Sequence, residues 1–139
     1  MTSPLISLIV PCFNEQRRVK ESIEAIAAFF SEEEEEFELV VVDDGSTDRT
    51  ASIVETLIAS NSSLVKNTRL IRVSHKGKGW AVKSGMLSGS GKYRFLADAD
   101  LSMPIEYIDR FLPPINVNTD IAIGSREYHG AKRFNEPIL

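Results

Sequence analysis

Residues Tyr93 to Pro104, with the sequence YRFLADADLSMP, decide how this chain folds and where its chemistry lies. The first five residues, through Ala97, are mostly apolar and predict a short strand that ends on two carboxylates. Asp98 and Asp100 are separated by one small residue, so in extended backbone both side chains point to the same side. Two neighbouring anions repel each other, and a hard divalent cation with oxygen ligands is the simplest group to hold between them.

A purely structural role is the alternative for the same pair. Asp98 and Asp100 can form a strand-end turn and cap the short helix that starts near Pro104. The Asp-Ala-Asp spacing alone does not separate these two interpretations. The residues that follow the other predicted strands favour the ligand site.

Working outward from this strand, apolar runs alternate with segments of helical spacing along the whole chain. Helix starts are expected at Asn14 and at Ser46 or Thr47, which are capping residue types. This alternation predicts an α/β fold with a mostly parallel sheet and helices on both faces. Strands are expected at 5–10, 37–42, 70–73, 93–97 and 120–123, and helices around 19–30, 51–58, 79–88 and 105–112.

The unusual residues of the chain collect after the predicted strand ends. In open parallel sheets, ligands bind beyond those carboxyl ends, at the point where the strand order reverses. Acids, bases and glycines gathered at one rim predict a site for phosphate and metal. The residues are Pro11, Asn14 and Glu15, then Asp43 and Asp44, then His75 to Gly79, then Asp98 and Asp100, and finally Gly124 to Arg126.

Composition limits the class of protein. The chain has 139 residues, 42% of them hydrophobic, which predicts one domain over residues 1–139 with a real core. The formal net charge of −4 argues against nucleic acid as a partner of the whole chain. Cys12 is the single cysteine, which excludes an internal disulfide and fits a reducing compartment. We expect Cys12 to be a small buried residue rather than a nucleophile.

Five pieces in this order resemble the family 2 glycosyltransferases, most closely the polyprenyl-phosphate or dolichyl-phosphate hexosyltransferases. The pieces are IVPCFNE, VVVDDGSTD, HKGKGWAVKSGM, FLADADLSMP and IAIGSR. The resemblance implies the three-layer, Rossmann-like GT-A fold of nucleotide-diphospho-sugar transferases. It also implies inverting transfer of a hexose, with glucose expected, from a UDP-linked donor to a polyprenyl or dolichyl phosphate. Members of the family use Mg²⁺ or Mn²⁺.

The resemblance also implies roles for individual residues. Asp98 would contact the donor or the metal, and Asp100 is the first choice as metal ligand. Arg126 would reach a donor or acceptor phosphate, a role that suits its fork of donors. Lys78 would meet the diphosphate. Ser102 departs from the pattern, since the mannosyl-phosphate branch commonly has Gln there.

Four more residues belong to the nucleoside end by the same resemblance. Either Asp43 or Asp44 would accept the imide N–H of uracil, a role that suits a carboxylate because it only accepts. Pro11 and Glu15 would line the loop that touches the nucleoside. Structural roles remain the alternatives. Asp43 and Asp44 could form a turn into the next helix. Pro11 could end the strand, and Glu15 could be an acidic residue in the first turn of a helix. His75 is expected to be a partly exposed strand-end residue without a role.

Family members continue beyond the point where this chain stops. We therefore expect a nucleotide-binding core whose acceptor groove and membrane contacts lie in segments absent here. A cytoplasmic location, at the membrane face in the longer protein, follows from this expectation. Lys132 and Arg133 are interpreted as ordinary solvated charges or the start of a basic edge.

Two other classes of protein compete with the transferase. A haloacid-dehalogenase-type phosphatase also has Asp-x-Asp after an apolar strand, but there the pair follows the first strand of the domain. A noncatalytic nucleotide-binding module would carry the same donor-side residues. Phosphate release from an aryl phosphate would favour the first class, and an assay of a longer chain would separate the second.

Overall fold

A computed structural model describes residues 5–33, 36–60, 65–125 and 127–131 of the chain. The described chain contains two compact units, Met1–Tyr107 and Ile108–Leu139. The first unit contains a four-stranded sheet in which all neighbouring strands are parallel, with the order β3-β2-β1-β4. None of the helices in the described ranges has the length and apolar character to cross a bilayer.

The predicted elements are confirmed, except the fifth strand. The observed bounds of each helix and strand lie within two residues of the predicted ones. The parallel sheet with helices confirms the predicted α/β class. The strands are β1 (Ile6–Cys12), β2 (Phe37–Asp43), β3 (Thr68–Arg72) and β4 (Tyr93–Leu96), and the helices are α1 (Val19–Ser31), α2 (Thr50–Ala59), α3 (Lys78–Ser88) and the 3₁₀-helix η1 (Ile105–Phe111).

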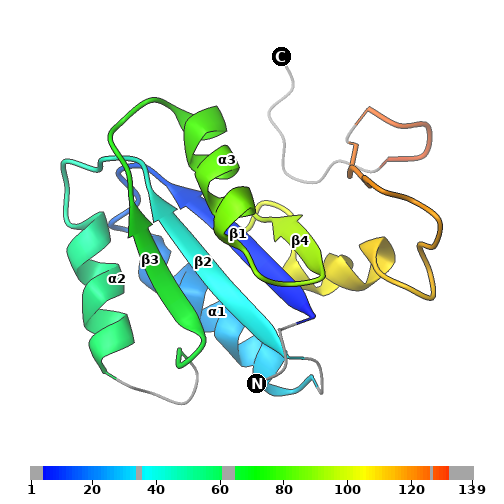
Figure 1. Cartoon of the computed structure of the whole chain (residues 1–139), viewed down its shortest axis with the longest axis horizontal. Coiled ribbons are helices and arrows are strands. Elements are labelled where there is room, and N and C mark those ends of the chain that lie inside the picture. The colour runs from blue at the N-terminus through cyan, green and yellow to red at the C-terminus, as the bar shows by residue number, and fades with distance from the viewer. Residues whose placement is uncertain (1–4, 34–35, 61–64, 126, 132–139) are drawn as a thin grey trace. The chain divides into compact units, whose positions relative to one another are not determined.

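The central strands β1 and β2 are buried on both faces. Ile9, Val40 and Val42 form a fully buried cluster with Ala81 of α3. Their chain neighbours, such as Leu39, alternate to the opposite face and are buried as well. Figure 1 shows α3 and α1 on opposite faces of the sheet. Burial on both faces explains why these strands are continuous apolar runs in the sequence.

Helix α3 lies close to the sheet because it carries a glycine at the contact. A Cβ added to Gly85 would lie 2.4 Å from Ile9 Cγ2 and 3.0 Å from Val42 Cγ2. The first distance is below any real carbon contact, so a side chain at Gly85 would force the helix away from β1.

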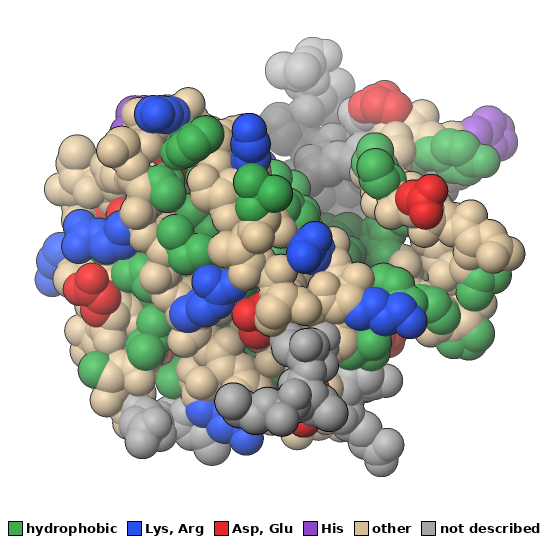
Figure 2. Space-filling view, viewed as in Figure 1, with side chains coloured by type: hydrophobic (Ala, Val, Ile, Leu, Met, Phe, Trp, Pro, Cys, Tyr) green, Lys and Arg blue, Asp and Glu red, His purple; other side chains and the backbone are tan. Residues whose placement is uncertain are grey.

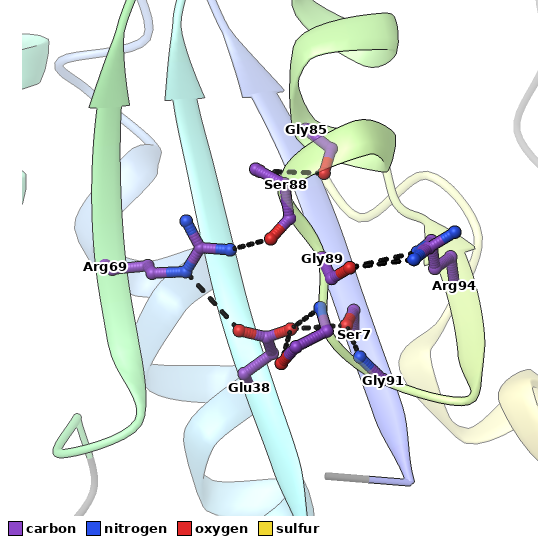
Figure 3. A network of polar contacts seen from close by, with 9 residues as sticks. Ser7, Glu38, Arg69, Gly85, Ser88, Gly89, Gly91 and Arg94 are labelled. Carbon is purple, nitrogen blue, oxygen red and sulfur yellow. Dashed lines mark hydrogen bonds and ion pairs between the residues drawn. The ribbon is translucent and has the colours of Figure 1, made fainter. Parts of the chain in front are cut away.

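A polar network beside this contact ties together β1, β2, β3 and the segment before β4 (Figure 3). The Glu38 carboxylate accepts hydrogen bonds from Ser7 Oγ at 2.5 Å and from the backbone N–H and hydroxyl of Ser90 at 2.5 and 2.9 Å. Arg69 Nε lies 3.4 Å from the same carboxylate and its Nη2 donates to the Ser88 carbonyl. Burial alone would raise the pKa of Glu38, but these donors lower it to about 2.

The helix starts differ from the predicted caps. Asn14 does not cap α1, whose N-cap residue is Arg18, and its own backbone is left-handed, with φ of 53°. Its side-chain oxygen instead accepts hydrogen bonds from the N–H groups of Thr47 and Asp48, at 2.9 and 3.3 Å. Neither Ser46 nor Thr47 caps α2, whose N-cap residue is Arg49. The N–H of Thr50 donates instead to Asp48 Oδ1 at 2.8 Å.

The prediction of a fifth strand at residues 120–123, in the second unit, is wrong within the described ranges. Residues 120–123 pair with no strand within the described ranges. Ile121 and Ile123 are 79% and 82% exposed. An extended apolar segment becomes a strand only when a neighbour satisfies its backbone groups, and local sequence does not supply that neighbour.

Candidate functional site

The strand order reverses at β1, which lies between β2 and β4. At such a point the loops after neighbouring strands diverge and leave a crevice beyond the carboxyl ends. A cavity of about 360 Å³ lies there and is lined by residues that follow all four strands. The predicted site residues on its wall are Pro11, Glu15, Asp44, Lys78, Asp98 and Asp100.

Asp98 and Asp100 were predicted to lie in extended backbone. In the structure they lie in a turn after β4. The N–H of Leu101, which has a left-handed φ of 49°, donates to the Asp98 carbonyl at 2.9 Å. The N–H of Ser102 donates to Asp100 Oδ1 at 2.9 Å. Both carboxylates still line the cavity, with side chains 46% and 42% exposed. The pair therefore builds the turn and also faces the cavity.

Basic side chains stand beside both carboxylates. Lys78 Nζ lies 2.5 Å from Asp98 Oδ1. Arg18 Nη1 lies 4.0 Å from Asp100 Oδ2, and its Nε lies 3.2 Å from Glu15 Oε2. These cations reduce the repulsion between the two carboxylates.

The Asp98 and Asp100 donor set fits a metal that is shared with a diphosphate. Within the described ranges, no group of three or more His, Cys, Asp or Glu side chains is arranged to hold a metal ion. Mg²⁺ in nucleotide sites is typically bound by one or two carboxylates, with phosphate oxygens and water as the other ligands. Two partly exposed carboxylates on one cavity wall match that pattern and do not match an all-protein cage.

Helix α3 begins at the cavity. Its N-cap residue Gly77 has φ of 97°, which a residue with a side chain rarely adopts. Gly77 and the first helical residue, Lys78, both line the cavity. A helix N-terminus presents free N–H groups and positive potential, so this wall is suited to an anion such as phosphate.

The predicted nucleoside pair separates into two different environments. Asp44 lines the cavity, but its carboxylate accepts hydrogen bonds from the N–H groups of Lys76 and Gly77, at 3.0 and 2.9 Å, and from His75 Nδ1. Burial would raise the pKa of Asp44, but these donors lower it below its usual range. Asp43 is fully buried and off the cavity wall, and its Oδ1 has no described partner.

Phe13 and His75 both line the cavity, although the sequence analysis did not consider Phe13 and expected no role for His75. Their rings are stacked, with centroids 4.2 Å apart and planes 18° apart, and both rings line the cavity. His75 Nδ1 lies 2.8 Å from Asp44 Oδ2. The only sequence signal was position, because Phe13 directly follows β1 and His75 lies three residues after the end of β3. Stacked rings of this kind also suit a flat nucleobase.

Two further residues are relevant to the site, Ser22 behind the carboxylate turn and Cys12 on the cavity wall. Ser22 Oγ of α1 donates to the carbonyl of Ala99, between the two aspartates, and fixes the turn against that helix. Cys12 is buried, as predicted, and burial together with nearby Glu15 and Asp43 raises its pKa to about 12. Its thiol is therefore not a nucleophile near neutral pH. Arg126, predicted to bind phosphate, and Lys132 and Arg133 lie outside the described residues.

Comparisons with known sequences identify the family of this chain. The sequence model described as "Glycosyl transferase family 2" matches residues 7–138. The chain is 38% identical over 101 residues to a dolichyl-phosphate beta-glucosyltransferase of Dictyostelium discoideum, covering 68% of this chain and 30% of that protein. It is 37% identical over 133 residues to a dolichol-phosphate mannosyltransferase of Pyrococcus furiosus, covering 96% and 36%. The chain thus spans about a third of the length of these relatives.

A solved structure has the same fold. The mannosyltransferase PcManGT of Pyrobaculum calidifontis, in complex with GDP-Man and Mn²⁺, matches with a TM-score of 0.59 and 28% sequence identity. The match covers 71% of this chain and 28% of that one. The region of similarity includes enough of the sheet and helices to identify the fold as GT-A.

Proposed function

Because the chain belongs to glycosyl transferase family 2, we propose that it forms the donor-binding part of an inverting, metal-dependent polyprenyl-phosphate hexosyltransferase. The observation that carries this proposal is that one cavity is lined by the Asp98 and Asp100 turn, by Lys78 and by the N-terminus of α3. A nucleoside diphosphate needs opposite charge, N–H donors and a cation at one place. The cavity offers all three kinds of contact.

Different residues of the cavity are proposed to bind different parts of the donor. The nucleoside is proposed to lie against Phe13 and His75, next to Asp44 on the same cavity wall. The diphosphate is proposed to lie at the start of α3, where Lys78 and the helix N–H groups stabilise its charge. Asp98 and Asp100 would hold Mg²⁺ or Mn²⁺, which neutralises the leaving diphosphate when bound.

The proposed reaction is a single displacement at the anomeric carbon. An oxygen of the polyprenyl phosphate forms a bond to this carbon while the bond to the nucleoside diphosphate breaks. The bonding electron pair leaves on the β-phosphate oxygen, and attack from the opposite face inverts the configuration. The acceptor oxygen is already ionised, so the chain needs no general base to activate it.

UDP-glucose is the proposed donor. The dolichyl-phosphate glucosyltransferase relative supports this choice, and Ser102 stands where the mannosyl branch commonly has Gln. The mannosyltransferase relative makes GDP-mannose the donor to test beside it. The phosphatase alternative is set aside, because the family match covers nearly the whole chain and the aspartate pair follows β4 rather than β1.

A calorimetric panel tests the proposal. UDP, UDP-glucose, GDP and GDP-mannose are titrated into the protein with Mn²⁺ and again with a chelator. We expect metal-dependent binding with uridine nucleotides preferred. Binding of equal strength in the chelator would contradict the metal site, and a preference for guanosine nucleotides would move the proposal to the mannosyl branch.

A further inference from the structure

Charge is unevenly distributed along this chain. Residues 56–97 contain eight of the 16 Lys and Arg residues and none of the 20 Asp and Glu residues. This stretch therefore has a formal charge of +8, and the rest of the chain has −12, which together give the net −4. The stretch includes β3, α3 and β4, and all eight basic residues lie in the described ranges. Residues 56–97 are therefore strongly basic although the net charge of the whole chain is small and negative.

The basic residues of this stretch are prominent on the face of the sheet covered by α3. Figure 2, in the same orientation as Figure 1, shows Lys and Arg side chains distributed over this face with few acidic ones. Lys76, Lys83 and Arg94 are exposed there, and none of them forms an ion pair with a described carboxylate. Lys76 Nζ instead lies 4.6 Å from the ring centre of Trp80.

Large apolar side chains lie among these charges. Helix α3 buries Ala81 and Gly85, so the helical period places Trp80, Lys83 and Leu87 on its outer side. Trp80 is 38% exposed and Leu87 is 75% exposed. Leu96 pairs in register with Ile9, which faces α3, and is 37% exposed. We call Lys76, Trp80, Lys83, Leu87, Arg94 and Leu96 the α3 surface.

We propose that the α3 surface docks on an anionic lipid bilayer. Lys and Arg are attracted to acidic headgroups, and Trp and Leu among them are suited to the boundary between headgroups and acyl chains. A duplex nucleic acid would use the charges but would gain little from an exposed Leu87. The choice of a bilayer over other polyanions rests on the proposed lipid-linked acceptor.

The position of α3 connects this surface to the cavity. Gly77 and Lys78 line the cavity, and the α3 surface begins at the neighbouring Lys76. A bilayer on the α3 surface would therefore bring the phosphate of a membrane-embedded acceptor toward the wall that is proposed to bind the donor diphosphate. The acidic remainder of the protein would be repelled from the bilayer, which favours one orientation.

Flotation with vesicles tests the docking surface. Vesicles of phosphatidylcholine alone are compared with vesicles containing about one-third phosphatidylglycerol, and neither contains polyprenyl phosphate. We expect binding only to the anionic vesicles, and loss of that binding in 0.5 M NaCl because the charges are then screened. Each basic residue near such a surface contributes roughly fivefold to partitioning, so K76Q/K83Q is expected to weaken it on the order of 20-fold.

A matched control has the same change in net charge. R17Q/R49Q removes two exposed arginines that precede α1 and α2, outside the α3 surface, and should change partitioning less than twofold. Equal loss in both double variants would mean that binding follows net charge and would overturn the proposal. Absence of binding by the unchanged protein would overturn it too.

The variant Leu87→Ser tests whether the α3 surface binds a bilayer specifically or any polyanion. We expect this variant to weaken binding to anionic vesicles several-fold and to leave binding to heparin unchanged. Equal vesicle binding by L87S and the unchanged protein would identify a general polyanion surface and reject the bilayer. Calorimetry of UDP with each variant is the independent readout for the donor site, so a failed donor proposal is distinguishable from failed docking.

Discussion

The Asp44 carboxylate and His75 Nδ1 lie 2.8 Å apart and join the end of β2 to the loop that begins α3. Two backbone N–H groups of that loop donate to the same carboxylate. Asp44 therefore organises one wall of the cavity from inside, whether or not it also touches a ligand. Asp43, its neighbour, has one oxygen without a described partner.

Substitution of Asp43 and Asp44 by Asn, one at a time, should distinguish the roles of these two aspartates in stability and in nucleotide binding. Asp44→Asn is expected to lower the free energy of unfolding by about 1.5–3 kcal/mol at pH 7, because it removes charge-assisted hydrogen bonds. The folded-state pKa of Asp44 is lowered, so this stabilisation is present above the unfolded pKa and disappears as pH falls through the folded pKa. Urea unfolding of both proteins at pH 7 and in acid measures the difference. An equal difference at both pH values would contradict this role.

Asp43→Asn is the matched control for the nucleobase contact. Asp43 is fully buried and off the cavity wall, so this change should leave UDP affinity within about twofold of that of the unchanged protein. Asp44 lines the cavity, and Asp44→Asn should weaken UDP by about tenfold if its carboxylate also accepts the imide N–H of uracil. Calorimetry and urea unfolding on the same preparations measure both quantities. Unchanged UDP affinity in D44N, with the fold intact, would remove Asp44 from the nucleobase contact.

Asp100→Ala should remove most of the effect of metal on nucleotide binding. The diphosphate would then face Asp98 without a well-held cation, and a tenfold or greater loss of UDP affinity in Mn²⁺ is expected, which is about 1.4 kcal/mol. Affinity in chelator should change little. The proposed metal role of Asp100 would be wrong if D100A kept the full enhancement by Mn²⁺. Ser102→Ala, which keeps the backbone donor to this turn, is the control.

Glu38→Gln should destabilise the protein in a pH-dependent way. The pKa of Glu38 is lowered from 4.5 to about 2 in the folded state, so its contribution is fully present above pH 4.5 and is lost as pH falls toward 2. We expect a deficit of about 2 kcal/mol at pH 7, the scale of a hydrogen-bonded charge. Urea unfolding at pH 7, 4 and 2.5 should show the deficit shrinking with acid. A deficit that grows in acid would contradict the hydrogen-bonding account.

Gly85→Ala and Gly79→Ala form a matched pair on α3. The new methyl group at Gly85 would meet Ile9 at 2.4 Å, and we expect a loss of about 1–3 kcal/mol from overpacking. No atom lies within 4 Å of a Cβ at Gly79, where higher helix propensity should stabilise the protein by up to about 1 kcal/mol. Thermal unfolding of both variants checks the contrast. Equal effects would show that α3 does not depend on close packing at Gly85.

Sequence patterns predicted the elements whose signal is local. Apolar runs located β1 and β2 because both faces of these strands are buried, and the helices followed from period and length. The fifth strand failed because strand formation depends on a partner that sequence spacing does not identify. The residues around the cavity were found from their position after strands, a rule of topology and not of residue type.

The finer geometry of the site could not be predicted in this way. His75 was set aside because a lone histidine after a strand carries no signal, yet folding brings it against Phe13, 62 positions earlier in the chain. Asn14 was expected to cap the next helix, since the sequence does not show that its backbone turns left-handed. The internal bonds of Asp44 depend on a loop more than 30 residues away.

The loops after β1 and β2 act as one piece because Asn14 bonds across them. Its N–H donates to Ser46 Oγ at 2.9 Å while its side chain binds the backbone after Ser46, and the N–H of Glu15 donates to Thr50 Oγ1 at 2.8 Å. The two loops thus lose their conformational entropy when the protein folds and not when a ligand binds. A ligand at the nucleoside end meets a preorganised surface, so its affinity is not reduced by the need to order these two loops.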